Sequence, residues 1–474
     1  MREAPHVSAF AKGIIVRSMH IAPAGDRAVL VTLPGASAAR VRSAADGVRT
    51  VAGVVAAIVG HESVYVIGTS DVDAVRRAID SAPVSQTAVT RHHEIEVSFH
   101  DAHALDLNEF LSHVGVSRDE FLRRVPGIRL VVRYLGFRAG FAYLEGWPGE
   151  WSMPRRSTSR NVVPGGSFAI AASMAGFYPV DLPGGWNILG RTAAPLWENP
   201  FAPGDEISIV VSGAPLTSAA RAAAVGGAPH GDPVADIITP GQLTTIVAAP
   251  DWKRVEYGEP PGGPFDDEAA SIANAAVGNP AGAPLLECVL VGPKLRMRKK
   301  LRVAFCDADL NVRKFESDDI DVGRLRGMRG YLAIEGGVEG EVRKGGVLCG
   351  APPTTAAAGE VAGAPRVNPK EIRILPGPHD APPLPEDWEV TPHMNRVGIR
   401  LRPLAPMAVK LPTELPSCGA QFGTLQWHAD GSVVALGPDH PVTGGYLQPA
   451  TVISTERWKL AQLAPGDRIK LIAV

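Results

Sequence analysis

Three closely spaced arginines are the first side chains in this sequence that suggest a chemical task. Arg155, Arg156 and Arg160 precede a Val-Pro-Gly-Gly-Ser turn at 163–167. Guanidinium groups bind carboxylates and phosphates through paired hydrogen bonds, and glycine backbone N–H groups form anion-binding concavities. The spacing predicts an anion cradle, although a solvent-exposed basic hairpin is the alternative. Its candidates are the catalytic residues Arg156, Arg160 and Ser167 and the substrate-binding residues Gly165 and Gly166.

A second group of candidates surrounds one tryptophan. Trp186 follows Gly184 and Gly185 in the stretch 175–192, which is rich in turn residues. Glycine lets the backbone pass close to a bound molecule, and an indole offers a flat apolar face. We therefore expect Trp186 and Arg191 to form walls of a substrate pocket. A tryptophan that only anchors the core would produce the same pattern.

Single polar residues elsewhere complete the candidate site. Tyr143 lies in a glycine-framed segment and is a catalytic candidate, because its hydroxyl can donate a hydrogen bond to a substrate. In the second half, the substrate-binding candidates are Asn395, Arg396, Gln426 and Thr443. Each of these four residues also suits an ordinary cap or turn.

The sequence lacks several common catalytic motifs, including HExxH, GxSxG and a GxGxxG that follows a strand. Its four cysteines are widely spaced and form no CxxC pair, which favours reduced thiols over a disulfide framework or a zinc site. The histidines between 92 and 103 follow no metal-ligand spacing. We therefore expect no bound metal.

Composition narrows the classes of partner and compartment. The formal charge of the 474 residues is −2, which argues against nucleic acid or an anionic membrane as a partner. No apolar run approaches the roughly 18–20 residues of a membrane span, and the N-terminus does not resemble a signal peptide, so we expect a cytoplasmic protein. The 51 glycines and 42 prolines are about a fifth of the chain and predict many turns between short strands.

The elements that must position these residues form two β-rich halves. Residues 19–82 predict a β-α-β-β-α order, with Asp71 capping the last helix, and Ser117 begins a capping box with Glu120. In the second half, one helix begins near Asp266 or Asp267 and ends near Gly278. The expected organisation is a leader at 1–18, a small α/β lobe at 19–90, a barrel at 91–211, a linker at 212–236 and a half with two β-rich lobes at 237–474.

One short sequence occurs in both halves. An Ala-Pro-Gly-Asp turn enters an apolar alternating stretch at 202–205 and again at 464–467. If both stretches are late barrel strands, the two halves contain related β-domains. A match this short also arises by chance.

The first half resembles allophanate hydrolase subunit 1, a family also known as the B subunit of 5-oxoprolinase and as the kinase inhibitor KipI. The residues that carry the resemblance are Gly25-Asp26-Arg27, Asp106-Leu107, Gly136-Phe137, Gly140 to Leu144, Pro154-Arg155-Arg156, Arg160, Val163-Pro164, Gly166-Ser167, Tyr178-Pro179, Pro183 to Trp186 and Gly190-Arg191-Thr192.

The second half resembles the partner family, allophanate hydrolase subunit 2, also known as the C subunit of 5-oxoprolinase or KipA. The carrying residues include Leu243-Thr244-Thr245, Asp266, Ala273-Asn274, Val277-Gly278-Asn279, Pro376-Gly377-Pro378, Asn395-Arg396, Gln426, Thr443 to Tyr446 and Pro465-Gly466-Asp467. The chain thus looks like a fusion of the two subunits.

The resemblance implies a mainly β fold with α/β lobes and a cyclophilin-like β-barrel in each half. It also implies kinship with the carboxyltransferase part of urea carboxylase. The implied function is a component of an amide- or lactam-acting hydrolase, or of a biotin-dependent carboxyltransferase. Such a component works on a small amide with a third 5-oxoprolinase-type subunit or a biotin carboxylase and carrier. It uses ATP or partner-borne biotin and carries no covalently bound cofactor of its own.

One departure from the family pattern favours a different function. After Thr245 the family usually continues with a Val-Gln-Asp-x-Gly-Arg run, but residues 246–251 here read Ile-Val-Ala-Ala-Pro-Asp. Loss of a charge-stabilising donor can lower a rate by about 10²–10³. The alternative is therefore a non-catalytic regulatory or binding protein of the KipI type, with a degenerate second half.

Overall fold

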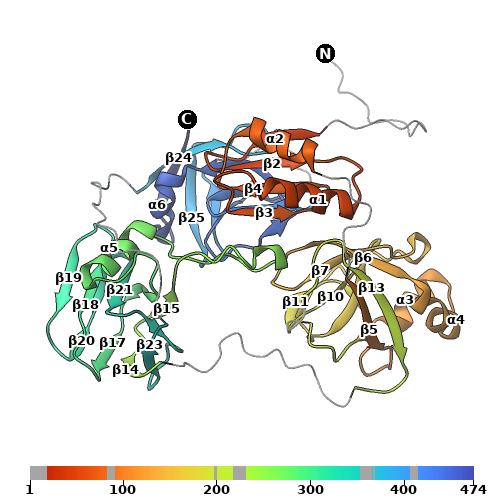
Figure 1. The fold of residues 1–474 in the computed structure, drawn as a ribbon, viewed down its shortest axis with the longest axis horizontal. Coiled ribbons are helices and arrows are strands. Elements are labelled where there is room, and N and C mark those ends of the chain that lie inside the picture. The colour runs from red at the N-terminus through yellow and green to blue at the C-terminus, as the bar shows by residue number, and fades with distance from the viewer. Residues whose placement is uncertain are drawn as a thin grey trace.

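A computed structural model describes most of the chain (Figure 1). The described residues are 19–82, 91–196, 200–216, 231–352, 366, 369–405 and 415–474. The expected leader at 1–18 and the centre of the expected linker, 217–230, lie outside them. The expected fold class, mainly β with α/β lobes and one closed barrel in each half, is confirmed.

A small α/β lobe opens the described chain. Its elements are β1 (His20–Pro23), β2 (Ala28–Thr32), α1 (Ala38–Val48), β3 (Ala56–Val59), β4 (Ser63–Ile67) and α2 (Val72–Ser81). Along β2, Val29 and Val31 pack against the helices, whereas Ala28 and Leu30 pack against the second half of the chain. Asp71 caps α2 as expected. The structure has a β1–β2 hairpin where we predicted a single strand. The sequence did not reveal β1, because this strand is short and contains a proline.

The first barrel is closed and antiparallel except where β5 and β13 run in parallel. Its strands are β5 (His92–Ser98), β6 (Arg129–Leu135), β7 (Ala142–Glu145), β9 (Ser167–Ala171), β10 (Met174–Phe177), β12 (Asn187–Arg191) and β13 (Glu206–Ser212), and a separate pair is β8 (Arg160–Val163) with β11 (Leu182–Gly184). Helices α3 (Leu107–Val114) and α4 (Arg118–Arg124) pack on its core, and Ser117 caps α4 as expected.

The second half begins with a lobe of two packed sheets. The first sheet contains β14 (Pro233–Thr239), β17 (Lys294–Met297), β20 (Asp319–Asp321), β22 (Val338–Glu339) and β23 (Val347–Gly350), and the second contains β15 (Leu243–Val247), β16 (Leu285–Val291), β18 (Val303–Cys306), β19 (Val312–Phe315) and β21 (Arg324–Ile334). Helix α5 (Asp267–Val277) packs on the second sheet. As expected, Asp266 caps its start and Gly278 ends it in a left-handed conformation.

The second barrel is also closed, and it repeats the strand order of the first. Its strands are β24 (Glu371–Pro376), β25 (Asp387–Met394), β26 (Gly398–Pro403), β28 (Thr424–Trp427), β29 (Val433–Leu436), β31 (Leu447–Val452) and β32 (Arg468–Ala473), with a separate pair of β27 (Cys418–Gly419) and β30 (Thr443–Gly444). Two short helices, η4 (Ser454–Glu456) and α6 (Arg457–Ala461), precede β32. When the strands of each barrel are numbered in chain order, their order around the closed sheet is the same in both barrels.

The repeated Ala-Pro-Gly-Asp turn confirms that the two barrels are related. In the first barrel the Asp205 carboxylate accepts a hydrogen bond from the Ala202 N–H at 2.9 Å, and the Val132 carbonyl accepts one from the Gly204 N–H at 2.7 Å. In the second, Asp467 accepts from the Ala464 N–H at 2.9 Å, and Val390 accepts from the Gly466 N–H at 2.8 Å. The same bonds at the same strand entry make chance an inadequate explanation.

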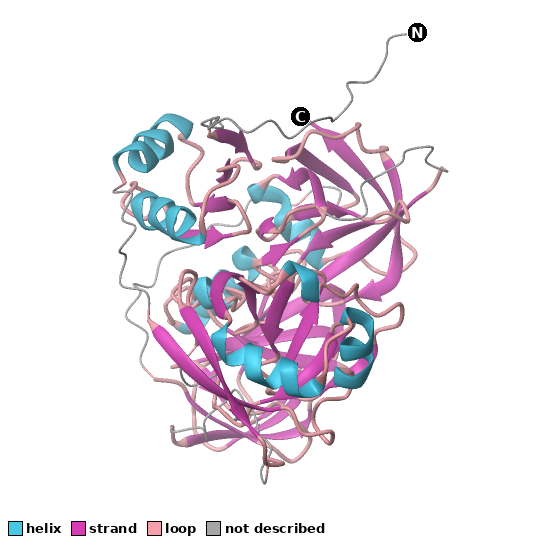
Figure 2. Cartoon of the chain, turned by 90° about the vertical axis from the view of Figure 1, so that its right-hand side faces the viewer, coloured by secondary structure: helices cyan, strands magenta, loops and turns pink. Residues whose placement is uncertain are grey.

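The small α/β lobe joins the two halves. The Gly25 N–H donates to the Pro376 carbonyl at 3.1 Å, and the Ser454 hydroxyl donates to Asp26 at 2.5 Å. The lobe of two packed sheets, from β14 to β23, is called the β14–β23 lobe. Figure 1 shows the first barrel and this lobe at opposite ends of the molecule. Figure 2 shows that strands predominate. None of the described helices has the length and hydropathy that a membrane span requires.

Candidate functional site

A cavity of about 830 Å³ lies where the two barrels meet. Four of the residues selected from the sequence line it: Tyr143 and Trp186 from the first half, and Gln426 and Thr443 from the second. The two halves therefore contribute candidates to one site, at a junction of domains where ligand pockets are common.

Each barrel presents the same kind of turn to this cavity. In the first barrel, β11 ends at Gly184 and is followed by Gly185 and Trp186 before β12. In the second, β30 ends at Gly444 and is followed by Gly445 and Tyr446 before β31. All six of these residues line the cavity. Two related Gly-Gly-aromatic turns thus face one volume.

Glycine is required at two positions beside the cavity because other groups pass very close. A Cβ on Gly184 would collide with the Tyr178 ring and hydroxyl, and a Cβ on Gly136 would collide with the Thr443 hydroxyl. The Thr443 hydroxyl donates to the Leu135 carbonyl at 3.0 Å, which joins the barrels directly. The turn residues that surround Trp186 therefore serve close packing at the edge of the cavity.

Aromatic rings form the first-barrel wall. Phe141 is at their centre, with edge contacts to Tyr178 and Trp186 at centroid distances of 5.1 and 5.5 Å. Tyr143 stacks on Tyr134 at 4.4 Å and meets Trp186 at 5.6 Å. Burial raises the pKa of Tyr178, so its hydroxyl stays protonated at neutral pH. This wall is apolar with a few hydroxyl groups, and Trp186 is half-buried in it.

Two polar side chains on the cavity remain available for a ligand. Arg155 is exposed, lines the cavity and forms no ion pair with any described residue. The Gln426 amide is buried, and it makes no side-chain hydrogen bond within the described part of the chain. A guanidinium and an amide placed against aromatic walls can hold a carboxylate and an amide group together.

The other two arginines of the predicted cradle bind a carboxylate of the protein itself. Asp106 is 3% exposed, and its Oδ1 accepts from Arg160 at 2.6 Å and from Arg156 at 3.1 Å. Its Oδ2 accepts from the Ile188 N–H at 2.7 Å. Neither arginine lines the cavity. In the structure both guanidinium groups stabilise the attachment of α3 to β12.

The predicted glycine turn is closed by internal hydrogen bonds. The Gly165 N–H donates to Asp181 at 2.7 Å, the Gly166 N–H donates to the Tyr178 carbonyl at 2.7 Å, and the Ser167 N–H donates to the Pro164 carbonyl at 3.2 Å. Arg191 Nε donates to the Gly165 carbonyl at 2.8 Å. These four candidates lie outside the cavity, and the three N–H groups already have acceptors.

Asn395 and Arg396 also lie away from the cavity. The Asn395 side chain accepts from the Val397 N–H at 2.8 Å and so shapes its own turn. Arg396 binds Asp439 at 2.7 and 2.8 Å and Glu287 at 2.9 Å. Burial acts to lower the pKa of Arg396, but these two carboxylates raise it overall, so the guanidinium stays charged. The ion pair of Arg396 with Glu287 joins the second barrel to the β14–β23 lobe.

Sequence reasoning missed several residues that line the cavity. Arg155 belongs to the arginine group, but nothing in the spacing distinguishes it from its neighbours. Tyr446 carries a usable signal, because it follows a glycine pair just as Trp186 does. Ser417, whose hydroxyl accepts from Tyr134 at 3.1 Å, gives no sequence signal.

Two family models match the chain. "Carboxyltransferase domain, subdomain C and D" matches residues 19–203, and "Carboxyltransferase domain, subdomain A and B" matches 257–347 and 340–473. The two models together cover most of both barrels and of the lobes that accompany them.

Curated relatives have names that fit these models. A putative urea carboxylase of Emericella nidulans is 27% identical over 50% of this chain and 24% of its own length. The B subunit of the Escherichia coli 5-oxoprolinase is 34% identical over 26% of this chain and 58% of its own length. The C subunit from the same species is 27% identical over 50% of this chain and 90% of its own length. The chain thus spans less than two thirds of the first two relatives.

A solved structure repeats the whole arrangement. The crystal structure of TTHA0988 matches with a TM-score of 0.80 at 26% identity, covering 94% of this chain and 99% of that one. The family models and the curated relatives fit a fusion of the two subunit types in one polypeptide. The chain belongs to the carboxyltransferase-domain family, with subdomains C and D in its first half followed by subdomains A and B in its second.

Proposed function

We propose that this chain is a component of an amide- or lactam-acting hydrolase or carboxyltransferase of the 5-oxoprolinase and urea carboxylase type. The observation that supports the proposal is the cavity between the barrels. There the guanidinium of Arg155 and the amide of Gln426, which have no side-chain partner among the described residues, lie between two Gly-Gly-aromatic turns. The component works in the cytoplasm with separate subunits.

The chemistry of these reactions needs two kinds of stabilisation. A carboxylate must be held, which suits the fork of donors on Arg155. Negative charge that develops on an amide oxygen or nitrogen needs donors already in place, which suits Gln426. The N–H groups of Gly185 and Gly445 donate to no described residue and are further candidates. The aromatic wall excludes water, which strengthens each of these interactions.

The two cofactors implied by the family fit unequally. The aromatic walls and the Gln426 amide suit the flat ureido ring of a partner-borne biotin, which would supply or accept the carboxyl group. The turn at 163–167 does not suit a triphosphate, because its glycine N–H groups already donate to Asp181 and to the Tyr178 carbonyl. We therefore propose that any ATP binds to the partner subunit.

Adjacent arginines provide a matched test. In a reconstituted mixture with the partner subunits, Arg155→Ala should lower urea- or 5-oxoproline-dependent ATP turnover by about 100-fold or more. Arg156→Ala removes the same charge one residue away but outside the cavity, so turnover should stay within about threefold of the parent. Equal turnover by the parent and Arg155→Ala contradicts the proposed site.

The altered run at 246–251 supports a second candidate, a non-catalytic regulatory or binding protein of the KipI type. Within this run Asp251 accepts a hydrogen bond from the Lys253 N–H at 2.9 Å and shapes a turn. This candidate predicts no turnover with any partner mixture. It also predicts that Arg155→Ala and Arg156→Ala leave binding of a partner protein equally unaffected.

A further inference from the structure

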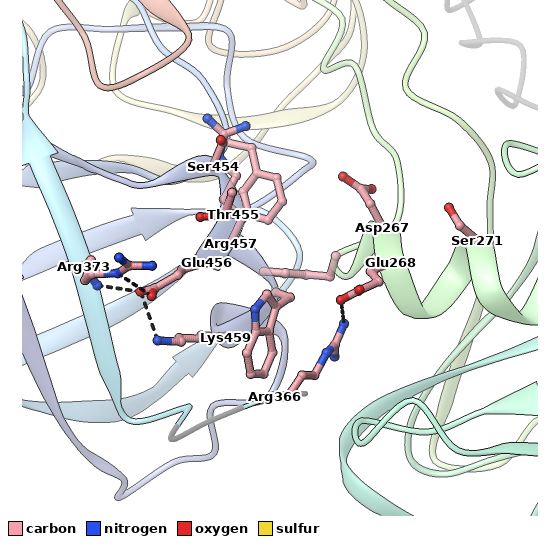
Figure 3. Close-up of a pocket in the computed structure, with 13 residues that line it drawn as sticks. Asp267, Glu268, Ser271, Arg366, Arg373, Ser454, Thr455, Glu456, Arg457 and Lys459 are labelled. Carbon is pink, nitrogen blue, oxygen red and sulfur yellow. Dashed lines mark hydrogen bonds and ion pairs between the residues drawn. The ribbon is translucent and has the colours of Figure 1, made fainter. Parts of the chain in front are cut away.

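A second cavity, of about 620 Å³, separates α5 from the η4–α6 segment of the second barrel (Figure 3). It shares no lining residue with the cavity between the barrels. Phe265, Phe422 and Trp458 give it apolar surface, and charged side chains from both sides project into it. Its chemistry therefore needs an explanation of its own.

Most of the charged groups around this cavity are already paired. Glu456 binds Arg373 at 2.7 Å and Lys459 at 3.0 Å. On the opposite side, Glu268 binds Arg366 at 3.0 Å. These pairs neutralise each other, so they do not define a ligand.

Arg457 is one of two exceptions. Its Nη2 donates to the Gln421 side chain at 3.0 Å, but its buried Nε has no acceptor and no described carboxylate lies within ion-pair distance. Burial lowers the pKa of this guanidinium. Among the described residues its hydrogen-bond partner is a neutral amide, so none of them supplies an anion at ion-pair distance.

Asp267 is the second exception. It is the first residue of α5, it is exposed to the cavity, and it makes no hydrogen bond or ion pair with any described residue. Desolvation and the neighbouring Asp266 raise its pKa to about 6. Asp266 itself caps α5 and binds Arg366, so it cannot serve a ligand.

We propose that this cavity binds a small zwitterion, an amino acid with a free ammonium and a free carboxylate group. The carboxylate pairs with Arg457 and the ammonium with Asp267, which lie on opposite sides of the cavity (Figure 3). The aromatic side chains contact the amino-acid side chain. A lone anion or a lone cation would satisfy only one of the two charges. The site is independent of the proposed function and lies at a joint between lobes.

Calorimetry with the purified full chain tests the proposal, with L-leucine, L-phenylalanine and L-glutamate as probes. At least one probe should bind with a Kd of about 1 mM or below. Its 2-oxo acid, which lacks the ammonium group, and its amide, which lacks the carboxylate, should each bind at least tenfold more weakly. Absence of binding by all three probes overturns the proposal, as does equal binding of either analogue.

Variants that remove one charge at a time test whether Asp267 and Arg457 bind the ligand. Asp267→Asn and Arg457→Gln should each weaken binding at least tenfold. Asp73→Asn, in the exposed first turn of α2, is the matched control and should bind like the parent. Arg457 is partly buried, so if Arg457→Gln fails to fold, Asp267→Asn is the decisive variant. Unchanged binding by Asp267→Asn overturns the proposal. Arg155→Ala should bind the amino acid normally, which separates this result from failure of the proposed function.

The pH dependence gives a third readout. Asp267 faces Asp266 and Glu268 on its own helix, Glu287 of β16, and Arg366 and Arg457 across the cavity. Ionised Asp267 binds an ammonium group better than the protonated form, so affinity should rise as the pH increases through about 6. Asp267→Asn should remove this rise, and a rise that persists in the variant contradicts the assignment.

Discussion

The two barrels follow the same path, yet arginines in corresponding loops have different surroundings. Arg138 lies in the loop between β6 and β7, and Arg396 lies in the corresponding loop between β25 and β26. Arg396 is enclosed by Glu287 and Asp439. Arg138 is exposed and forms no ion pair with the described residues, although it lines a cavity of about 130 Å³ beside Asp439.

The presence of an arginine in a repeated loop therefore does not determine its role. The partner lobe does, because the β14–β23 lobe supplies Glu287 to the second barrel, whereas the corresponding loop of the first barrel borders the cavities. Asp106 shows the same principle within the first half. It binds Arg156 and Arg160 but not Arg155, which forms no ion pair with any described residue.

Replacing the two loop arginines should have very different effects on stability. Arg396→Ala leaves Glu287, which is 1% exposed, with one fewer positive partner, and should lower the free energy of unfolding by about 3–5 kcal/mol. Arg138→Ala should change it by less than about 0.5 kcal/mol, because no described residue pairs with this side chain. Denaturant unfolding of both variants measures the comparison. Similar losses in the two variants would show that both barrels depend on their loop arginine to the same extent.

A buried histidine gives the second barrel a pH sensitivity. His440 is 1% exposed, and burial lowers its pKa to about 4. The folded state therefore binds fewer protons than the unfolded state between about 6.5 and 4, and stability present above 6.5 is lost as the pH falls through this window. The loss from this group should be about 3 kcal/mol by pH 4.

Val180 lies two residues before Leu182, just as His440 lies two residues before the corresponding Val442. Val180 is therefore the matched control position in the first barrel. His440→Val should remove that part of the pH dependence measured by thermal unfolding between pH 7 and 4. Val180→Ala should leave the pH dependence as it is in the parent. If the parent and His440→Val lose stability in parallel as the pH falls, another group is responsible.

The fold was more predictable from sequence than the site. Caps such as Asp71, Ser117 and Asp266 act on N–H groups within three residues, so local spacing reveals them. The repeated Ala-Pro-Gly-Asp turn is also a local pattern, and it predicted that the two barrels are related. The β1 strand was missed because its stability comes from pairing with β2 rather than from its own residues.

The candidate site depends on partners that are distant in the sequence. Tyr143, Trp186, Gln426 and Thr443 converge because related turns face each other, and glycine-aromatic patterns point to such turns. Arg156 and Arg160 do not reach the cavity because Asp106, about 50 residues earlier, binds them. Spacing alone cannot distinguish an arginine that holds a ligand from one that holds a buried carboxylate.

Close approach of the barrels should make Gly136 intolerant of any side chain. Gly136→Ala places a methyl group against the Thr443 hydroxyl, and relief of the collision should cost about 2 kcal/mol. The first residue after the corresponding strand of the second barrel is Asn395, so there the loop accommodates a side chain. Gly127→Ala, with open space around its Cβ, is the control and should cost less than about 0.5 kcal/mol. An unchanged unfolding midpoint for Gly136→Ala would mean that the barrels separate easily.

The smallest expected effect concerns the repeated turn itself. Asp205 and Asp467 make the same bond to the alanine N–H, but Asp205 also binds Arg91 at 2.6 Å and His93 at 3.0 Å, whereas Asp467 binds only Lys370 at 3.0 Å among the described side chains. Asp205→Ala should therefore destabilise the protein by about 1 kcal/mol more than Asp467→Ala. Equal losses in denaturant unfolding would show that the shared bond, and not the added ion pairs, carries the stabilisation. The turns would then be equivalent in energy as well as in geometry.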